Sequence, residues 1–144
     1  MTPQAKRRWK WAGGVVLAAL AAIQLVPVDR SNPPVTGDLE APPDVQAILR
    51  RACYDCHSHD THWPWYAYVA PLSWRVAGHV HDGRAELNFS EWSGYPPGRQ
   101  HKKRQQVWDE VREGNMPLGD YLWLHPDAAL TDADRAVLQR WAGE

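Results

Sequence analysis

Apolar residues recur at helical spacing in four stretches of the chain. In the first stretch, residues 44–52, four of them lie at positions i, i+3, i+4 and i+7 and so share one helical face: Val45, Ile48, Leu49 and Ala52. Asp44 follows two prolines and is a suitable N-cap residue. The pattern therefore predicts a helix that starts at Asp44 and leads directly to Cys53.

The three other stretches are bounded by residues that start or end helices. Pro71 is suited to open the second helix and Gly83 to close it. The third is expected over residues 100–113 with Gly114 at its end, and Thr131 is a suitable cap for the last. Loops are expected over residues 58–70, 86–99 and 115–130. Because no stretch alternates with the period of a strand, the predicted fold class is all-α.

The N-terminal region has the pattern of a membrane anchor. Residues 1–10 carry four basic side chains and no acidic one, and residues 11–28 then run for 18 positions without a charge. As a helix this run would span about 27 Å, close to the ~30 Å of a hydrocarbon core. The pattern predicts a single transmembrane helix with its basic end in the cytoplasm. The alternative is a cleaved signal peptide, and both interpretations export the rest of the chain from the cytoplasm.

The remaining sequence divides into a spacer and one domain. Residues 29–43 contain four prolines and almost no large apolar side chain, which is typical of a stiff, solvated linker. The expected organisation is therefore a basic segment with its anchor over 1–28, a linker over 29–43 and a folded domain over 44–144. The domain carries 11 basic and 14 acidic residues, so a role in binding nucleic acid is not expected.

Cys53, Cys56 and His57 form the pattern C-x-x-C-H, which is the attachment signature of c-type haem. Two thiols three positions apart on one helical turn reach the same edge of a porphyrin. The next residue, His57, is then carried under the iron as its proximal ligand. The motif uses both cysteines of the chain and predicts one covalently attached haem c.

Two other kinds of site share the C-x-x-C part of this motif. A structural zinc site needs four ligands, and apart from the two cysteines only histidines remain as candidates. A thioredoxin-like dithiol would follow a β-strand, and no strand is expected here. The histidine directly after the second cysteine and the expected export favour haem.

Residues 44–144 resemble the small haem-binding domain family of bacterial membrane-anchored c-type cytochromes. The similar stretches are CYDCHS at 53–58, WPWY at 63–66, LNFSEW at 87–92 and YLWLHPDAAL at 121–130. Such domains are similar to class I cytochromes c, which are helical, bind one haem and carry the attachment motif near the start. The resemblance implies haem binding and, beyond it, electron transfer.

Met116 is the expected distal iron ligand. It is the only methionine besides Met1, and it lies 59 residues after His57 in the loop sequence Gly-Asn-Met-Pro. This order resembles class I cytochromes, whose distal ligand is a methionine followed by proline. A thioether opposite histidine raises the reduction potential. The alternative is a methionine that fills a gap in the core, and a loop flanked by glycine and proline suits that role poorly.

Six further histidines accompany the motif. His79 shares the apolar face of the second helix and is the competing ligand, although a core role is expected for it. His59 and His62 follow the motif and are expected to meet solvent rather than a haem propionate. Surface positions are expected for His81 and His101, and a role in ordering its loop for His125.

Aromatic and basic side chains supply further candidates around the haem. Arg75 and Arg84 are the candidate partners of the propionates, with plain surface roles as the alternative. Residues 99–104 form a basic run that would steer an acidic redox partner or simply be a solvated helix face. Seven aromatic residues would line the haem or pack between helices: Tyr54, Trp63, Trp65, Tyr66, Trp74, Trp92 and Tyr121.

These features together predict an electron carrier rather than an enzyme. The chain shows no acid–base or nucleophile arrangement, so no small-molecule substrate is expected. Its partners would be redox proteins and the inner membrane. The alternative function is a haem protein with an open iron position that binds a gas or handles peroxide.

Overall fold

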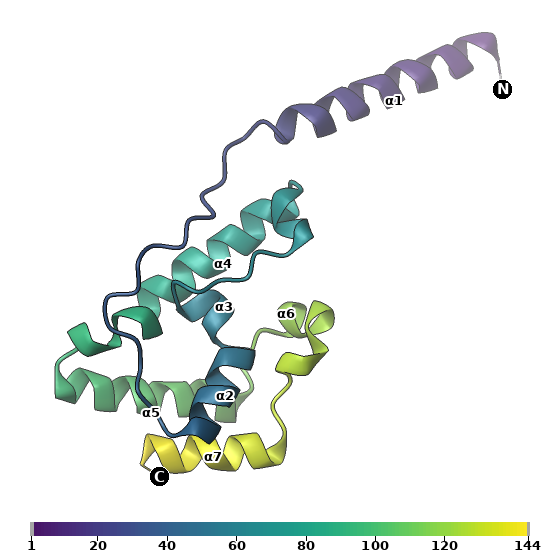
Figure 1. Cartoon of the computed structure of the whole chain (residues 1–144). Helices are drawn as coiled ribbons and strands as arrows, with labels where there is room; N and C mark the ends of the chain where they lie inside the picture. Colours follow the sequence, from purple (N-terminus) through teal and green to yellow (C-terminus); the bar gives the residue numbers. More distant parts are fainter. Residues whose placement is uncertain (1, 144) are drawn as a thin grey trace. The chain divides into compact units, whose positions relative to one another are not determined.

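A computed structural model describes residues 2–143, and these residues form helices and loops without a β-strand (Figure 1). The all-α prediction is confirmed. The α-helices are α1 (Pro3–Ile23), α2 (Pro43–Ala52), α3 (Tyr54–His57), α4 (Leu72–Glu86), α5 (Pro97–Glu113), α6 (Gly119–Leu124) and α7 (Asp132–Ala142). Three 3-10 helices join them: η1 (Trp65–Tyr68), η2 (Phe89–Gly94) and η3 (Pro126–Ala128).

Several predicted helix ends agree with the structure, and three differ, since α5 begins at Pro97 rather than at residue 100. Gly114 ends α5 in the left-handed conformation with φ 77°, and Thr131 caps α7 through a capping box with Asp134. The cap of α2 is Pro42 rather than Asp44, which lies in the first turn. The second helix does not end at Gly83 but continues to Glu86.

The chain divides into two compact units. The first, which we call the N-terminal unit, contains Met1–Ser31 and Trp63–Gly78. The second, which we call the main unit, contains Asn32–His62 and His79–Glu144.

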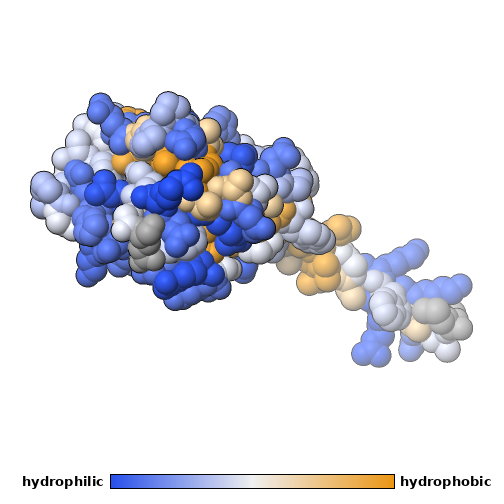
Figure 2. All heavy atoms as spheres, turned by 90° about the horizontal axis from the view of Figure 1, so that it is seen from below, coloured by the Kyte–Doolittle hydropathy of each residue, from blue (hydrophilic) through white to orange (hydrophobic). Residues whose placement is uncertain are grey.

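The predicted transmembrane helix over residues 11–28 is not present as one helix. α1 ends at Ile23, and a turn over residues 24–26 leads to Pro27. The helical part of the uncharged run is therefore about 20 Å long, shorter than a hydrocarbon core of ~30 Å. Of the helices in residues 2–143, none combines the length and the apolar character needed to cross a membrane. Figure 2 shows hydrophilic residues toward the start of α1 and hydrophobic ones toward its end.

Side-chain contacts hold the N-terminal unit together. The amide of Gln24 pairs with the backbone of Ala70, accepting its N–H at 2.9 Å and donating to its carbonyl at 3.2 Å. The guanidinium of Arg30 donates to the carbonyl of Ala67 and lies 4.5 Å from the ring centroid of Tyr68. Large apolar side chains of this unit remain exposed: Leu25, Val26, Trp65, Tyr68, Val69, Leu72 and Trp74.

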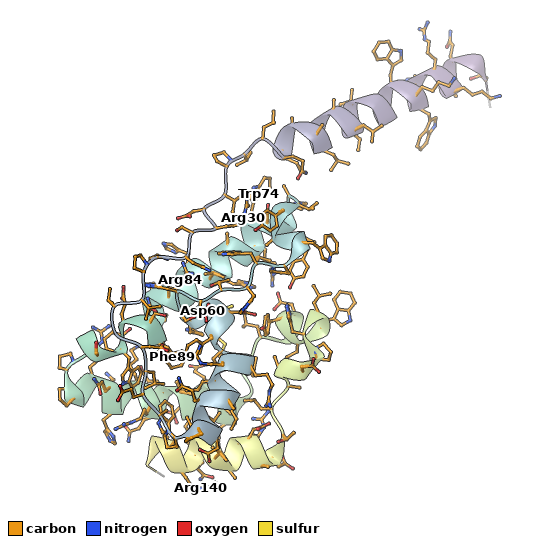
Figure 3. The ribbon with its side chains drawn as sticks, in the orientation of Figure 1. Arg30, Asp60, Trp74, Arg84, Phe89 and Arg140 are labelled. Atoms are coloured by element: carbon orange, nitrogen blue, oxygen red, sulfur yellow. The ribbon has the colours of Figure 1, made fainter. Side chains whose placement is uncertain are left out.

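The core of the main unit lies between α2, α5 and α7. α5 and α7 pack along each other, and α2 contacts α7, where the guanidinium of Arg51 bonds the carboxylate of Asp134 at 2.8 Å. Phe89 is completely buried in the interior, whereas Arg140 projects from the outer side of α7 (Figure 3). Among the core side chains are Val45, Ile48, Leu49, Tyr54, Trp92, Val107, Trp108, Val111 and Leu138.

Part of the proline-rich segment packs against the main unit instead of being a solvated spacer. Leu39 is 3% exposed and belongs to the core. The backbone N–H groups of Thr36 and Gly37 donate to the carbonyl of Ser90 at 3.1 and 3.0 Å. Composition predicted solvation because the segment has few apolar residues. Leu39 nevertheless belongs to the core, and Ala41 packs against it. Asp38 also bonds Arg50 and Tyr54.

We expect Leu39→Ala to lower the free energy of unfolding by about 2–5 kcal/mol, because it removes a buried side chain and leaves a cavity. Val35→Ala is the matched control, since Val35 is 53% exposed in the same segment, and its effect should stay within about 0.5 kcal/mol. Urea unfolding followed by circular dichroism measures both variants. Equal stability of the two would show that the segment does not belong to the folded core.

Candidate functional site

The two cysteines lie on the turn that follows α2. The N–H of Cys53 still bonds the carbonyl of Leu49 at 2.8 Å, so the helix delivers the chain directly into the motif. The N–H groups of Cys56 and His57 both donate to the carbonyl of Cys53, at 3.2 and 2.9 Å. This single turn, α3, brings the two thiols and the imidazole together as the spacing predicted.

The imidazole of His57 is oriented by the C-terminal end of α4. Its Nδ1 lies 2.9 Å from the carbonyl oxygen of Gly83 and 3.1 Å from that of Leu87. Since carbonyl oxygens only accept, Nδ1 carries the proton and Nε2 keeps its lone pair. Burial lowers the pKa of His57 below its ordinary value, against the opposite effect of the two carbonyls. The neutral imidazole is the form that binds a metal through Nε2.

Burial keeps both thiols protonated. It raises the pKa of Cys53 to about 12 and that of Cys56 to about 11. Redox-active C-x-x-C motifs show the opposite, a thiol pKa held below its ordinary value. The environment of these cysteines therefore disfavours the dithiol alternative.

A cavity of about 500 Å³ opens beside this turn. Such a volume lies in the ordinary range for ligand pockets, about 300–1,000 Å³. Cys53 and His57 of this turn border it, as does Met116 from a distant segment of the chain, whereas Cys56 is not among the lining residues. The remaining wall is supplied by Ala52, Glu86, Leu87, Phe89, Lys103, Gln106, Val107, Asp109, Glu110, Val111 and Pro117.

Met116 is held at the cavity by the end of α5. After the left-handed residue Gly114, the N–H groups of Asn115 and Met116 both donate to the carbonyl of Glu110, at 2.9 and 3.2 Å. These bonds turn the chain back along the helix end, so Met116 lies on the cavity wall rather than in the core. The structure thus places the predicted proximal and distal residues, 59 positions apart, on one cavity.

The haem-binding domain family matches residues 18–144 of this sequence. The chain belongs to this family. No curated protein and no solved structure matches it. Membership supports haem as the cofactor. The matched region begins at residue 18, before the expected domain start at residue 44.

The cavity fits a haem in its donors and in its walls. An imidazole nitrogen and a thioether sulfur are the donors found in cytochromes c, and Leu87, Phe89 and Val111 provide apolar surface for a porphyrin. Within the part of the chain that the structure describes, no group of three or more His, Cys, Asp and Glu side chains is placed to hold a metal ion.

The predicted aromatic residues of the main unit, Tyr54, Trp92 and Tyr121, do not line the cavity. Tyr54 stacks on Phe89 at 5.1 Å between ring centroids, and Trp92 packs in the core, so the interhelical role applies to both. The aromatic residue on the cavity wall is Phe89, which the sequence analysis did not single out. Lys103 also borders the cavity. Lys103 is spaced at i, i+4 and i+8 with Val107 and Val111, and this spacing would have placed it on the same helical face as those two cavity residues.

Arg84 does not line the cavity, and instead it hydrogen-bonds the segment that follows the motif. Its guanidinium donates to the carbonyl of Ser58 at 2.7 Å, to Oδ1 of Asn32 at 2.9 Å and to the hydroxyl of Thr61 at 3.0 Å. The other candidate for a propionate, Arg75, belongs to the N-terminal unit. Arg84 thus holds the segment after the motif against α4.

The histidine predictions are mostly confirmed, with one correction. The prediction for His59 was wrong: it is 8% exposed, and its ring bonds the carbonyl of Pro34 at 3.0 Å and the amide of Asn88 at 2.7 Å. Its partners come from distant segments, which local sequence does not reveal. His79 is half-buried and does not line the cavity. Four predictions are confirmed: His62, His81 and His101 are exposed, and His125 orders its loop by bonding the carbonyl of Tyr121.

Gly83→Ala should disturb the motif, because a Cβ at Gly83 would lie 2.6 Å from the carbonyl oxygen of Cys56. α4 would have to move off the turn and weaken its bond to His57, with a loss of about 1–3 kcal/mol in the free energy of unfolding. Gly78→Ala on the same helix meets nothing within 4 Å and should gain up to about 1 kcal/mol. Thermal unfolding of the two variants tests this contrast, and equal stabilities would refute the close approach.

Proposed function

We propose that this haem-binding chain is a monohaem c-type cytochrome that carries single electrons between redox proteins. The observation that carries the proposal is the cavity that His57 and Met116 both border, where the two side chains would hold one haem iron. A histidine–methionine pair leaves no iron position for a substrate and is the ligand set of electron-transferring cytochromes. The proposal therefore favours a carrier over an enzyme.

Each site residue has a distinct role in this proposal. The thiols of Cys53 and Cys56 would bond the haem covalently, and Nε2 of His57 would bind the iron while its Nδ1–H stays with the carbonyls of α4. The iron supplies a reversible one-electron change when haem is bound. The apolar side chains on the cavity wall would keep water away, which limits reorganisation and helps to set the potential.

We further propose that the protein works on the outer face of the bacterial inner membrane, in the periplasm. Covalent haem attachment through C-x-x-C-H fits that compartment, and the basic residues before the apolar run fit export. Exposed Trp65, Tyr68 and Trp74 of the N-terminal unit are the kind of side chain that lies at a membrane surface.

The partners that fit this role are other redox proteins. The basic run over residues 99–104 lies in the first half of α5, and its member Lys103 borders the cavity beside the acidic Glu86, Asp109 and Glu110. The rest of this run would steer a partner with an acidic surface, because charge complementarity speeds encounter.

Covalent attachment predicts that haem stays with the polypeptide through denaturing electrophoresis and that the stained band fractionates with periplasm or membranes. The double variant Cys53→Ala, Cys56→Ala removes both attachment points, so its band should lose peroxidase staining completely. The variant Cys53→Ala alone controls for expression, since one thioether remains. Haem that acid acetone extracts from the unmodified protein would refute haem c.

Met116→Ala should remove the far-red band of thioether-ligated ferric iron and let the reduced iron bind carbon monoxide. The reduction potential should fall by on the order of 0.1–0.3 V, part of the ~0.8 V range that axial ligands control. His79→Ala is the control and should leave spectrum and potential unchanged. A change with His79→Ala alone would indicate bis-histidine iron. No change with either variant would support the open-site alternative, which binds a gas or handles peroxide.

A further inference from the structure

A hydrogen bond connects the turn over residues 53–57, which we call the attachment turn, with α6, a helix far along the chain. Asp55, the residue before Cys56, accepts the hydroxyl proton of Tyr121 on Oδ2 at 2.8 Å. Its other oxygen accepts the N–H of His62 at 3.0 Å. The carboxylate of Asp55 therefore joins α6 and the segment after the motif to the turn that holds both cysteines.

Tyr121 lies just beyond the loop that carries Met116. The loop starts at Gly114, where the carbonyl of Glu110 fixes the N–H groups of Asn115 and Met116. It ends where α6 begins, at Gly119, two residues before Tyr121. Met116 thus lies between two points of attachment, one at the end of α5 and one at the Tyr121–Asp55 bond.

The second attachment depends on polar contacts rather than on burial. No residue of α6 is buried, so packing in the core does not fix this helix. The ring of Tyr121 stacks on that of His125 at 4.1 Å between centroids, a contact inside the same loop region. The hydrogen bond from the hydroxyl of Tyr121 to Asp55 connects this side chain to the attachment turn.

We propose that Tyr121 is a positioning residue for the distal ligand. Its hydrogen bond to Asp55 holds α6 against the attachment turn and so keeps Met116 at the cavity. This inference rests on the proposed function, because it takes Met116 as the iron ligand. A hydrogen bond to a charged acceptor is worth enough to change the fraction of open loop by about tenfold when it is lost.

Tyr121→Phe isolates the bond, because it removes the hydroxyl and keeps the ring that stacks on His125. In the purified haem-loaded protein we expect the far-red band to weaken and carbon monoxide to bind reduced iron about tenfold faster. Haem content should not change. Tyr68→Phe removes the hydroxyl of an exposed tyrosine in the N-terminal unit and should behave as the unmodified protein.

A second variant tests whether the effect runs through Asp55. Asp55→Ala should raise the rate of carbon monoxide binding as Tyr121→Phe does, and the double variant should be no faster than either single one. Additive effects would overturn the proposal, because they would mean that the two side chains act separately.

The outcomes separate this inference from the proposed function. If Met116→Ala changes the spectrum and Tyr121→Phe changes neither band nor rate, the positioning role is wrong and the methionine ligand stands. If Tyr121→Phe lowers only the thermal stability, Tyr121 is merely structural and the inference fails. If Met116→Ala itself has no effect, the ligand assignment fails, and the inference fails with it.

Discussion

The bond between Nδ1–H of His57 and the carbonyls of Gly83 and Leu87 is the constraint on which the site depends. It sets the tautomer of the imidazole and directs Nε2 away from α4, toward the side on which a metal would bind. The bond requires the end of α4 to lie against the attachment turn. That approach is possible because position 83 has no side chain, since a Cβ there would collide with the backbone of Cys56.

Other contacts act with this bond to hold the same two segments together. Arg84, next to Gly83, reaches the carbonyl of Ser58 and the hydroxyl of Thr61, so it fastens the chain that leaves the motif. Phe89 stacks on Tyr54 of the motif and also borders the cavity. The short stretch from Gly83 to Phe89 therefore orients the imidazole, braces the turn and supplies part of the cavity wall.

The opposite side of the cavity is built on helix packing. α5 packs on α7, and α7 is tied to α2 by the ion pair of Arg51 with Asp134, so the wall of the cavity rests on the core of the main unit. The loop with Met116 has weaker support, because α6 is not buried. A firmly held imidazole thus shares the cavity with a methionine whose position depends on a few hydrogen bonds. Under the proposed ligation, the iron position opposite His57 is the one that small changes in the chain would alter.

The sequence by itself determined the helical class, the C-terminal end of α5, the start of α7, the attachment turn and the two candidate ligands. These are local features: helical spacing, a glycine after a helix, a capping box and a motif of five residues act over a few positions. Tertiary structure decided the rest. The burial of Leu39 and His59, the close approach at Gly83 and the bond from Tyr121 to Asp55 join segments tens of residues apart, and periodicity carries no information about such contacts. Tertiary structure also decided that α1 ends at Ile23, before the predicted residue 28. A run without charges shows only that a helix is allowed, not how far it continues.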